Sequence, residues 1–479
     1  MPNQMNRFAP FLKQCFITSV VGLNLVSHGA VKGYPAVLFP QIYMPDSGIV
    51  SNRTMNSWIA SSFAVTPLIG CFMAPGIMDN FGRKMVQYIV CASAAMGWLI
   101  TFLAEQVEVI LLGRIIGGLS FGMMLILRSV LIGEYTSPKN RGAFLTTISL
   151  TETLGVFLIH FVGSVISWRI SALIMCFLPL TSLIMTIYIP ESPSWLVSRR
   201  RFDESRQAFI WLRGQDEEQE IEDMIKAKID LDEANKIHKI NIIGHVKKAE
   251  FYKPIILLVH LYAIVQFCGA IVNAAFPTEI IRSITNANVE TESWMMVFNV
   301  ERTLVNIIAI FVINIVKRRT MVAATIGLCI FSFLGLASYV YSKKFGLLTE
   351  DVLGIPAVMM FLHFLGISLG AVPLPSVLAG EVFPLQYRSI AGTISSISLC
   401  VCMILVIKTF PVLVWNVGIS GAYVIYAVIL IYCLIVVLYM LPETKGRTLQ
   451  DIENEYRGKS VVNAETEMQT LKNNTDEKN

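Results

Sequence analysis

The chain has 479 residues, of which 54% are hydrophobic and only 15% are charged, and its mean hydropathy is +0.61. Soluble globular domains usually carry about a quarter charged residues, so this composition excludes an ordinary soluble enzyme or binding module. The formal net charge of +4 is small and does not indicate a nucleic-acid partner.

The apolar residues fall in runs of membrane-spanning length. About 20 apolar residues are needed to cross a hydrocarbon core of about 30 Å, and lipid is therefore the expected solvent for most of the chain. The first run has no cleavage-type site after it and is predicted to be a span rather than a signal peptide. In chain order the predicted spans are 11–40, 55–78, 85–104, 108–133, 143–165, 168–189, 254–282, 294–316, 320–341, 354–380, 388–415 and 420–441.

A polar insert separates the sixth span from the seventh. Its apolar residues Ile221, Ile225 and Ile229 recur at helical spacing, which predicts short amphipathic helices outside the lipid. The tail beyond Pro442 is also polar. The predicted organisation is an N-terminal six-helix bundle at 1–189, a cytoplasmic amphipathic-helix linker at 190–253, a C-terminal six-helix bundle at 254–441 and a cytoplasmic tail at 442–479.

Basic residues in short loops predict the orientation. They gather in alternate loops, beside Arg83, Arg141, Arg318 and Arg388, and positive loops face the cytoplasm. Both termini are then expected to be cytoplasmic. The sequon at Asn52 lies in the first outer loop, which predicts a glycosylated asparagine.

Three motifs recur in the same order in the two groups of six spans. An Asp/Asn-x-x-x-Arg-type turn follows the second and eighth spans, a Glu–Arg pair seven residues apart ends the fourth and tenth, and Pro-Glu-Ser/Thr closes the sixth and twelfth. Three ordered echoes indicate a duplication of six spans. Parallel repeats of this kind place a substrate site near mid-membrane, between the halves.

These motifs resemble the sugar porter family of the major facilitator superfamily over residues 15 to about 456. Within that family the chain is most similar to insect facilitated trehalose transporter-like proteins. The matching stretches begin at Gly76, Gly113, Glu134, Pro190, Gln266, Pro373, Glu381 and Pro442.

The resemblance implies an all-α membrane protein with twelve transmembrane helices, the major facilitator fold and two six-helix pseudo-repeats. It further implies facilitative transport of a small neutral solute by alternating access, with a sugar (trehalose or a hexose) as the first expectation. A multi-pass monomer in the plasma membrane is expected, with a small-molecule substrate and the lipid bilayer as its partners and no nucleic acid.

The spans contain a small set of polar residues at the depth expected for a substrate. Gln266 matches a sugar-binding glutamine of the family, whereas Thr153 and Ser376 stand where the family usually has Gln and Trp. The prolines at 373 and 375 remove backbone donors and should unwind the tenth span. The predicted substrate-binding residues are Gln266, Thr153, Arg302, Asn273, Asn299, Pro373 and Ser376.

Charged residues within the spans need a reason, because each is costly in lipid. Arg302 lies about 18 Å from its cytoplasmic helix end, at a position where the family offers a neutral amide. An arginine there would suit an anionic or phenolic solute, so a non-sugar organic solute remains an alternative. Arg128 and Glu152 lie at similar depth, which predicts a contact between them, as a structural pair in the first interpretation and as a charged cavity wall in the alternative.

Charges at the cytoplasmic helix ends suit a gate, since half-hydrated Arg–carboxylate pairs can be exchanged. The repeated Glu134/Arg141 and Glu381/Arg388 pairs are the leading candidates. The predicted cytoplasmic gate comprises Asp79, Arg83, Glu134, Arg141, Glu191, Arg318, Glu381, Arg388 and Glu443.

Two features bear on the energy source and on enzyme activity. Symporters of the family carry an Asp after the Gly-Tyr pair of the first span, but here Gly33-Tyr34 is followed by Pro35, which favours facilitated diffusion. Glu152 and His160 keep a proton-coupled symporter as an alternative. No metal-binding, nucleophile-elbow or phosphate-loop motif stands out, so no enzyme activity, catalytic residue, metal or cofactor is predicted.

Overall fold

The computed structural model describes residues 2–44, 49, 52–214, 217–235, 249–285, 289–347, 352–382, 388–445, 452 and 455–456. Throughout this part of the chain the regular elements are helices, and no strand is present. Lipid favours this outcome, because a helix satisfies its backbone hydrogen bonds within one segment.

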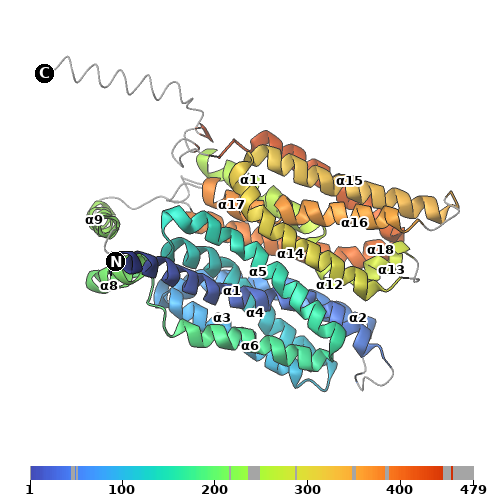
Figure 1. Cartoon of the computed structure of the whole chain (residues 1–479), viewed down its shortest axis with the longest axis horizontal. Helices are drawn as coiled ribbons and strands as arrows, with labels where there is room; N and C mark the ends of the chain where they lie inside the picture. Colours follow the sequence, from blue (N-terminus) through green and yellow to red (C-terminus); the bar gives the residue numbers. More distant parts are fainter. Residues whose placement is uncertain are drawn as a thin grey trace, which may run out of the picture.

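Six long helices form the first half. Their near-continuous apolar sequences follow one another through short loops, which makes neighbours antiparallel (Figure 1). At the tightest turn, Gly82 adopts φ +94°, a conformation that residues with a Cβ rarely adopt. The helices are α1 (Pro2–Ile42), α2 (Arg53–Phe81), α3 (Arg83–Phe102), α4 (Val107–Tyr135), α5 (Pro138–Val165) and α6 (Trp168–Thr186).

The second half contains six spans built from more pieces. The eleventh and twelfth predicted spans follow each other without a loop, and the non-helical Gly418 (φ +75°) marks the kink between them. With that joined pair, the eleven candidate membrane helices of the described residues confirm twelve predicted spans. The elements are α11 (Ala249–Phe267), α12 (Ala270–Ala275), α13 (Pro277–Thr285), α14 (Thr291–Ile315), α15 (Arg318–Lys344), α16 (Gly354–Gly366), η2 (Ile367–Ala371), α17 (Pro373–Val382) and α18 (Arg388–Met440).

Two spans of the second half depart from regular α-helix near their middle. The seventh span is interrupted at Gly269, which is left-handed at φ +82°. The tenth span differs from its prediction, because Pro373 does not unwind it. Instead the backbone makes a π-turn, with the Val372 N–H bonded to Ile367 O at 3.1 Å. The wider turn leaves the helix continuous although the proline supplies no donor.

Short helices of the insert lie at one end of the bundle, beside the start of α1 (Figure 1). They are α7 (Pro193–Ser198), α8 (Phe202–Arg213) and α9 (Glu218–Asn235). Ile221 and Ile225 are buried in a small cluster with Val197 and Phe209, which confirms the amphipathic pattern. Ile229 is 42% exposed and lies outside that cluster, so the apolar stripe is one turn shorter than predicted.

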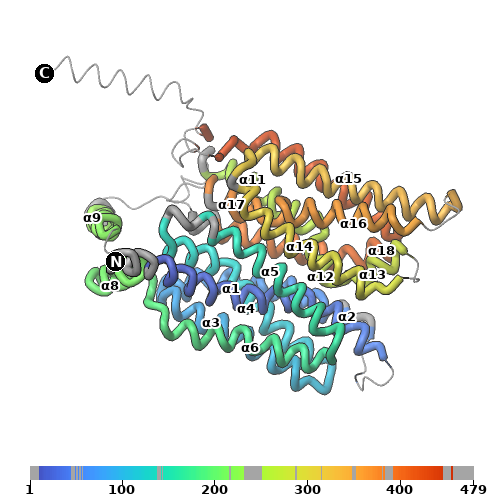
Figure 2. The backbone as a smooth tube through the Cα atoms, viewed as in Figure 1, coloured from blue at the N-terminus to red at the C-terminus, as the bar shows by residue number. Residues whose placement is uncertain are grey.

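The spans form two groups side by side, α1–α6 and α11–α18 (Figures 1 and 2). Where the groups meet, α2 packs on α18 and α5 packs on α14. In span numbers these contacts pair the second with the eleventh and the fifth with the eighth. Exchanging the two halves maps one contact onto the other, as a pseudo-twofold relationship requires.

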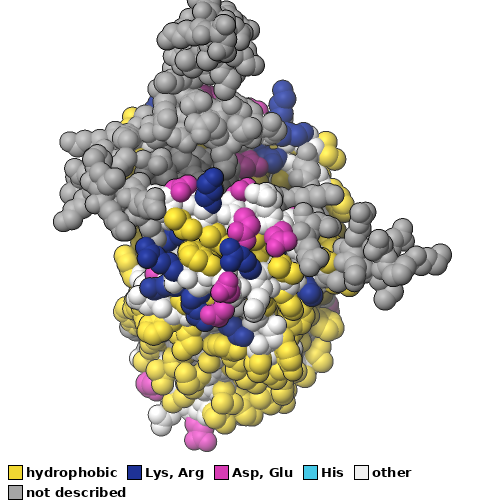
Figure 3. All heavy atoms as spheres, turned by 90° about the vertical axis from the view of Figure 1, so that its left-hand side faces the viewer, with side chains coloured by type: hydrophobic (Ala, Val, Ile, Leu, Met, Phe, Trp, Pro, Cys, Tyr) yellow, Lys and Arg dark blue, Asp and Glu magenta, His cyan; other side chains and the backbone are white. Residues whose placement is uncertain are grey.

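Charged and apolar side chains separate on the surface. Seen from the end that carries the insert, Lys, Arg, Asp and Glu gather there, while the flanks are largely hydrophobic (Figure 3). Large apolar side chains such as Tyr439 (90% exposed), Ile315 and Phe311 are uncovered on the spans. An apolar surface of this extent is untenable in water and indicates contact with lipid.

Candidate functional site

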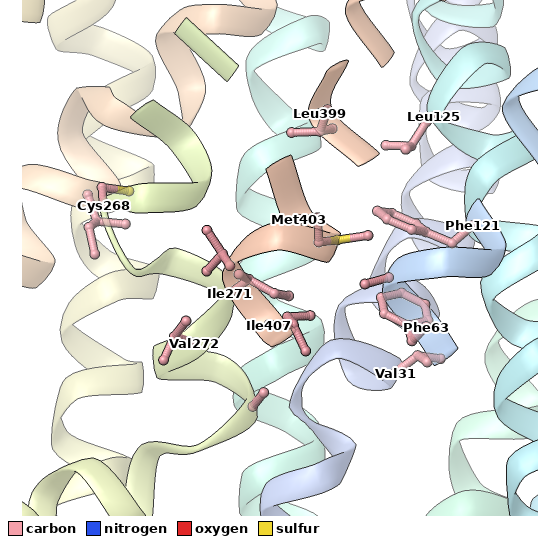
Figure 4. Packing of buried hydrophobic residues seen from close by; sticks show 14 of the residues in the cluster. Val31, Phe63, Phe121, Leu125, Cys268, Ile271, Val272, Leu399, Met403 and Ile407 are labelled. Carbon is pink, nitrogen blue, oxygen red and sulfur yellow. The ribbon is translucent and has the colours of Figure 1, made fainter. Parts of the chain in front are cut away.

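A cavity of about 100 Å³ lies between the two halves. Phe121 and Leu125 approach it from α4, opposite Leu399 and Met403 of α18 (Figure 4). The first half also contributes α1 and α5, and the second half contributes α11, α12, α14 and the stretch after η2. The cavity is therefore built by both repeats, at the place predicted for the substrate.

Four of the predicted substrate-binding residues line this cavity. They are Gln266, Thr153, Arg302 and Ser376. The Gln266 side chain is only 6% exposed, and its amide makes no hydrogen bond with any described residue. By contrast, Thr153 accepts a bond from Asn306 at 3.3 Å and Ser376 donates to Pro373 O at 2.7 Å. Gln266 is thus the neutral side chain with most capacity left for a ligand.

The other three predicted residues lie elsewhere. Asn273 and Asn299 line a second, much smaller void of about 10 Å³, and Arg302 lies between it and the main cavity. The break at Gly269 turns Asn273 away from the face that carries Gln266. Pro373 is buried and does not line the main cavity, although its neighbour Val372 does.

A charged cluster forms one wall of the main cavity. Glu152 of α5 receives Lys32 of α1 on Oε2 and Arg128 of α4 on Oε1, in two short ion pairs. The predicted Arg128–Glu152 contact is confirmed, and Lys32 is an addition that we had not predicted. A lysine inside the first apolar run was the available signal, because charges within spans are rare and functional.

His160 of α5 joins four helices on the side of the cavity away from the insert, which is the predicted outer side. Its Nε2 lies 3.2 Å from both Gly33 O and Ala274 O, and its Nδ1 lies 2.8 Å from Asn299 Nδ2. Carbonyl oxygens only accept, so Nε2 carries the proton and Nδ1 accepts from the Asn299 amide. We call Gly33, His160, Ala274 and Asn299 the outer clamp, since it joins both halves.

A second polar contact between the halves lies closer to mid-height. Ser149 donates to Asn306 Oδ1 at 2.7 Å, and the amide nitrogen of Asn306 donates to Thr153 at 3.3 Å. These bonds connect α5 to α14 beside the cavity. Thr153 therefore has a structural partner in this state of the molecule.

At the end that carries the insert, the first half is held by a network centred on Arg83. Its guanidinium makes a bidentate pair with Glu134, at 3.0 and 2.9 Å. The Glu191 carboxylate caps the start of α3 by accepting from Arg83 N at 2.9 Å, and Ser192 donates to Glu134. We call Arg83, Glu134, Glu191 and Ser192 the N-half latch.

The second half repeats this network. Arg318 pairs with Glu381 at 3.2 and 2.8 Å. Glu443 accepts from Arg318 N at 3.0 Å, and Thr444 donates to Glu381 at 2.6 Å. Arg318, Glu381, Glu443 and Thr444 form the C-half latch. Each glutamate of the repeated Glu–Arg motif thus binds the arginine that begins the third or ninth span.

The remaining predicted residues have other positions. Asp79 has an exposed side chain and contributes its backbone carbonyl, which accepts from Trp195 Nε1 at 3.0 Å. The side chains of Arg141 and Arg388 lie outside the described residues. Asn52 is exposed at the start of α2, where its Oδ1 caps the helix by accepting from Met55 N.

The two capping glutamates lie in different electrostatic surroundings. Burial raises the pKa of the Glu191 carboxyl, and the backbone N–H groups of Ser192, Arg83 and Lys84 offset only part of that effect. Burial acts in the same direction on Glu443, but there the N–H groups of Arg318, Lys445 and Arg319 outweigh it and lower its pKa. Equivalent positions in the two latches thus bind protons with different affinity.

A family model described as "Sugar (and other) transporter" matches residues 14–456. Among curated proteins, "Facilitated trehalose transporter Tret1" of Culex quinquefasciatus is 26% identical over 455 residues, covering 93% of this chain and 87% of that protein. The Apis mellifera ligustica protein of the same name is 27% identical, with coverages of 84% and 80%. The Aedes aegypti protein is 27% identical, but the chain spans only 52% of its length.

Solved structures share the fold at lower identity. The proton:xylose symporter XylE bound to 6-bromo-6-deoxy-D-glucose superimposes with a TM-score of 0.75 at 18% identity, over 92% of this chain and 99% of that one. The human organic anion transporter MFSD10 gives a TM-score of 0.60 at 14% identity, over 88% and 99%. In both comparisons the match extends over nearly the whole of the solved chain.

Proposed function

Because the chain belongs to the sugar (and other) transporter family, we propose that it carries a small neutral sugar across a membrane by facilitated diffusion, with trehalose or a hexose as the substrate. The curated relatives named as facilitated trehalose transporters support trehalose as the first candidate. The proline that follows Gly33-Tyr34, where symporters of the family carry an acid, supports facilitated diffusion.

The observation that carries the proposal is the cavity between the halves. It is lined by both repeats and offers Gln266, whose amide has unused donors and an acceptor, beside the hydroxyl groups of Thr153 and Ser376. Sugars are bound by neutral donors and acceptors set in an otherwise apolar pocket. Arg302 adds donors from α14.

Alternating access requires contacts that can be exchanged on either side of the cavity. In this proposal, residues 1–189 and 254–441 move as two bundles, and 190–253 and 442–479 stay in the cytoplasm. The outer clamp closes the cavity toward the outside in the present state. The two latches hold the inner ends of the helices within each bundle. Arg141 and Arg388, whose side chains lie outside the described residues, stay in the proposed cytoplasmic gate.

The proposed setting is the plasma membrane, with a monomer whose termini are both cytoplasmic. The gathering of charge at the end that carries the insert supports this orientation (Figure 3). Asn52 then lies outside as the proposed glycosylation site. Its helix-capping bond uses Oδ1, which leaves the capping role compatible with a glycan on Nδ2.

Uptake into proteoliposomes tests the proposal. The full chain is reconstituted, and entry of radiolabelled trehalose and glucose is measured without an ion gradient. Gln266→Ala should reduce uptake roughly fivefold, since one hydrogen bond to substrate is lost. Gln219→Ala is the matched control, because Gln219 bonds Asp223 on the exposed linker helix α9. If the wild type takes up neither trehalose nor glucose, the proposal is refuted.

The same vesicles decide between facilitated diffusion and proton coupling. A facilitator brings the sugar to equal concentrations on both sides, and a protonophore leaves the rate unchanged. Accumulation above the outside concentration that collapses with the protonophore would establish symport instead.

A further inference from the structure

Arg302 is a buried cation whose guanidinium group makes no hydrogen bond or ion pair within the part of the chain that the structure describes. Its side chain is 7% exposed, its Nε has no hydrogen-bond partner, and no bond of its guanidinium group is found among the described residues. The Phe364 ring lies 5.6 Å from Cζ, and Glu301, the preceding residue, also acts on the guanidinium group electrostatically. A guanidinium carries five N–H donors, and here they lie against the main cavity and the smaller void.

The cavity wall as a whole has a positive balance. Its described charged residues are Lys32, Arg128, Arg302 and Glu152, which is three cations against one carboxylate. The Glu152 carboxylate pairs with Lys32 through one oxygen and with Arg128 through the other. Glu301 precedes Arg302, but it lines neither space and its two carboxylate oxygens are buried without partners. Even with Glu301 counted, cations outnumber carboxylates.

A neutral sugar leaves this excess charge uncompensated within the membrane. Arginine binds a carboxylate through two parallel hydrogen bonds, which is stronger and more directional than its bonds to hydroxyl groups. A sugar whose ring carries a carboxylate would satisfy the free donors of Arg302, while its hydroxyl groups could still meet Gln266 and Thr153. The cost of a cation at this depth would then be offset when the substrate is bound.

We propose that the cavity also accepts acidic sugars, with Arg302 as the residue that binds their carboxylate. The proposal rests on the proposed function, since it places this second substrate class in the same cavity. It makes Arg302 a determinant of specificity and adds one consequence. Facilitated diffusion of a monoanion moves charge, so its uptake responds to the membrane potential, whereas uptake of a neutral sugar does not.

The test compares D-glucose with D-glucuronate, which differ only in the carboxylate at C6. Wild-type proteoliposomes should take up both, and an inside-positive potential should speed glucuronate entry alone. Arg302→Gln should reduce glucuronate uptake by about tenfold or more, because a charge-assisted pair is lost, and should reduce glucose uptake by a clearly smaller factor, because glucose loses at most neutral hydrogen bonds to Arg302. Arg302→Lys should restore part of the glucuronate uptake.

The control is Arg169→Gln, which removes an arginine of α6 that bonds Ala104 O and does not line the cavity. It should change neither uptake. If the wild type carries glucose or trehalose but glucuronate neither enters nor competes, the acidic-sugar proposal is overturned and the proposed function stands. If Arg302→Gln reduces both sugars equally, Arg302 has no role in distinguishing acidic from neutral sugars. If no sugar enters the wild-type vesicles, the proposed function itself fails.

Discussion

The Asn299 amide of α14 donates a 2.8 Å hydrogen bond to Nδ1 of His160 on α5 and so joins the two halves of the molecule. The opposite ring nitrogen of His160 faces Gly33 O and Ala274 O. One imidazole therefore connects elements of both halves, and every bond uses its neutral form. The space for the ring depends on Gly33, where an added Cβ would lie 2.9 Å from His160 Nε2.

Asn299→Ala should loosen the outer closure. The variant removes one hydrogen bond between the halves, worth about 1 kcal/mol, and should shift the population toward outward opening about fivefold. Hydrogen–deuterium exchange of the segment 270–285 should become faster. Thr303→Val is the control, because the Thr303 hydroxyl donates to the Asn299 carbonyl within the same helix and to no other described residue. Unchanged exchange in Asn299→Ala would remove the outer clamp from the mechanism.

Glu381→Gln should reduce transport while the protein still reaches the membrane. The substitution breaks the bidentate pair with Arg318 and weakens the bond from Thr444. Loss of a charge-assisted pair costs about 1.5–3 kcal/mol, so uptake should fall by about tenfold or more. Glu204→Gln, in an exposed linker ion pair, should have little effect. Normal uptake by Glu381→Gln would rule out a role for the C-half latch in transport.

The two capping glutamates should differ in their response to pH. The raised pKa of Glu191 means that the folded protein binds this proton more readily than the unfolded chain, so its charged form lowers stability at neutral pH. The lowered pKa of Glu443 means the reverse: its charge adds stability above the unfolded pKa, and this contribution is lost as pH falls through the lowered value.

Glu443→Gln should therefore lower the melting temperature at pH 7 more than Glu191→Gln does. The difference between the variants should shrink as pH falls toward the acidic pKa of Glu443. Thermal unfolding in detergent from pH 7 to below the ordinary pKa of Glu, about 4.3, measures this. Equal effects of the two substitutions on the melting temperature at every pH would contradict the opposite pKa shifts of Glu191 and Glu443.

Cys71 of α2 and Cys400 of α18 should form a cross-link between the halves. Their sulfur atoms are 3.8 Å apart, and a disulfide needs about 2 Å. Diamide, a membrane-permeant oxidant, accepts the two electrons and two protons that the thiols lose, and becomes a hydrazine. Uptake should fall on treatment and recover with dithiothreitol, because relative movement of the halves is arrested.

Cys71→Ser and Cys400→Ser should be insensitive to diamide, whereas Cys402→Ser, two residues along the same helix, should keep its sensitivity. If the Cys400→Ser variant is inhibited as strongly as the wild type, another thiol is responsible and these two helices do not control access.

Much of the architecture could be predicted because its signals are local. Runs of apolar residues report burial in lipid whatever they pack against, and repeated motifs such as Glu134 and Glu381 report duplication. The pairing of those glutamates was harder. The arginines that share their sequence motifs are Arg141 and Arg388, yet the partners that the structure describes are Arg83 and Arg318, which come from other helices.

The sequence by itself determined the number of spans, the six-plus-six repeat and the depth of each polar residue, because helix length and rise depend only on position along the chain. The tertiary structure alone decided which of those residues meet. Because of the left-handed turn at Gly269, Asn273 lines the smaller void. Because α14 packs against α5, Asn299 bonds His160 and does not line the main cavity. Rotation about a helix axis and contact between distant segments depend on packing of the whole molecule, and no local pattern records them.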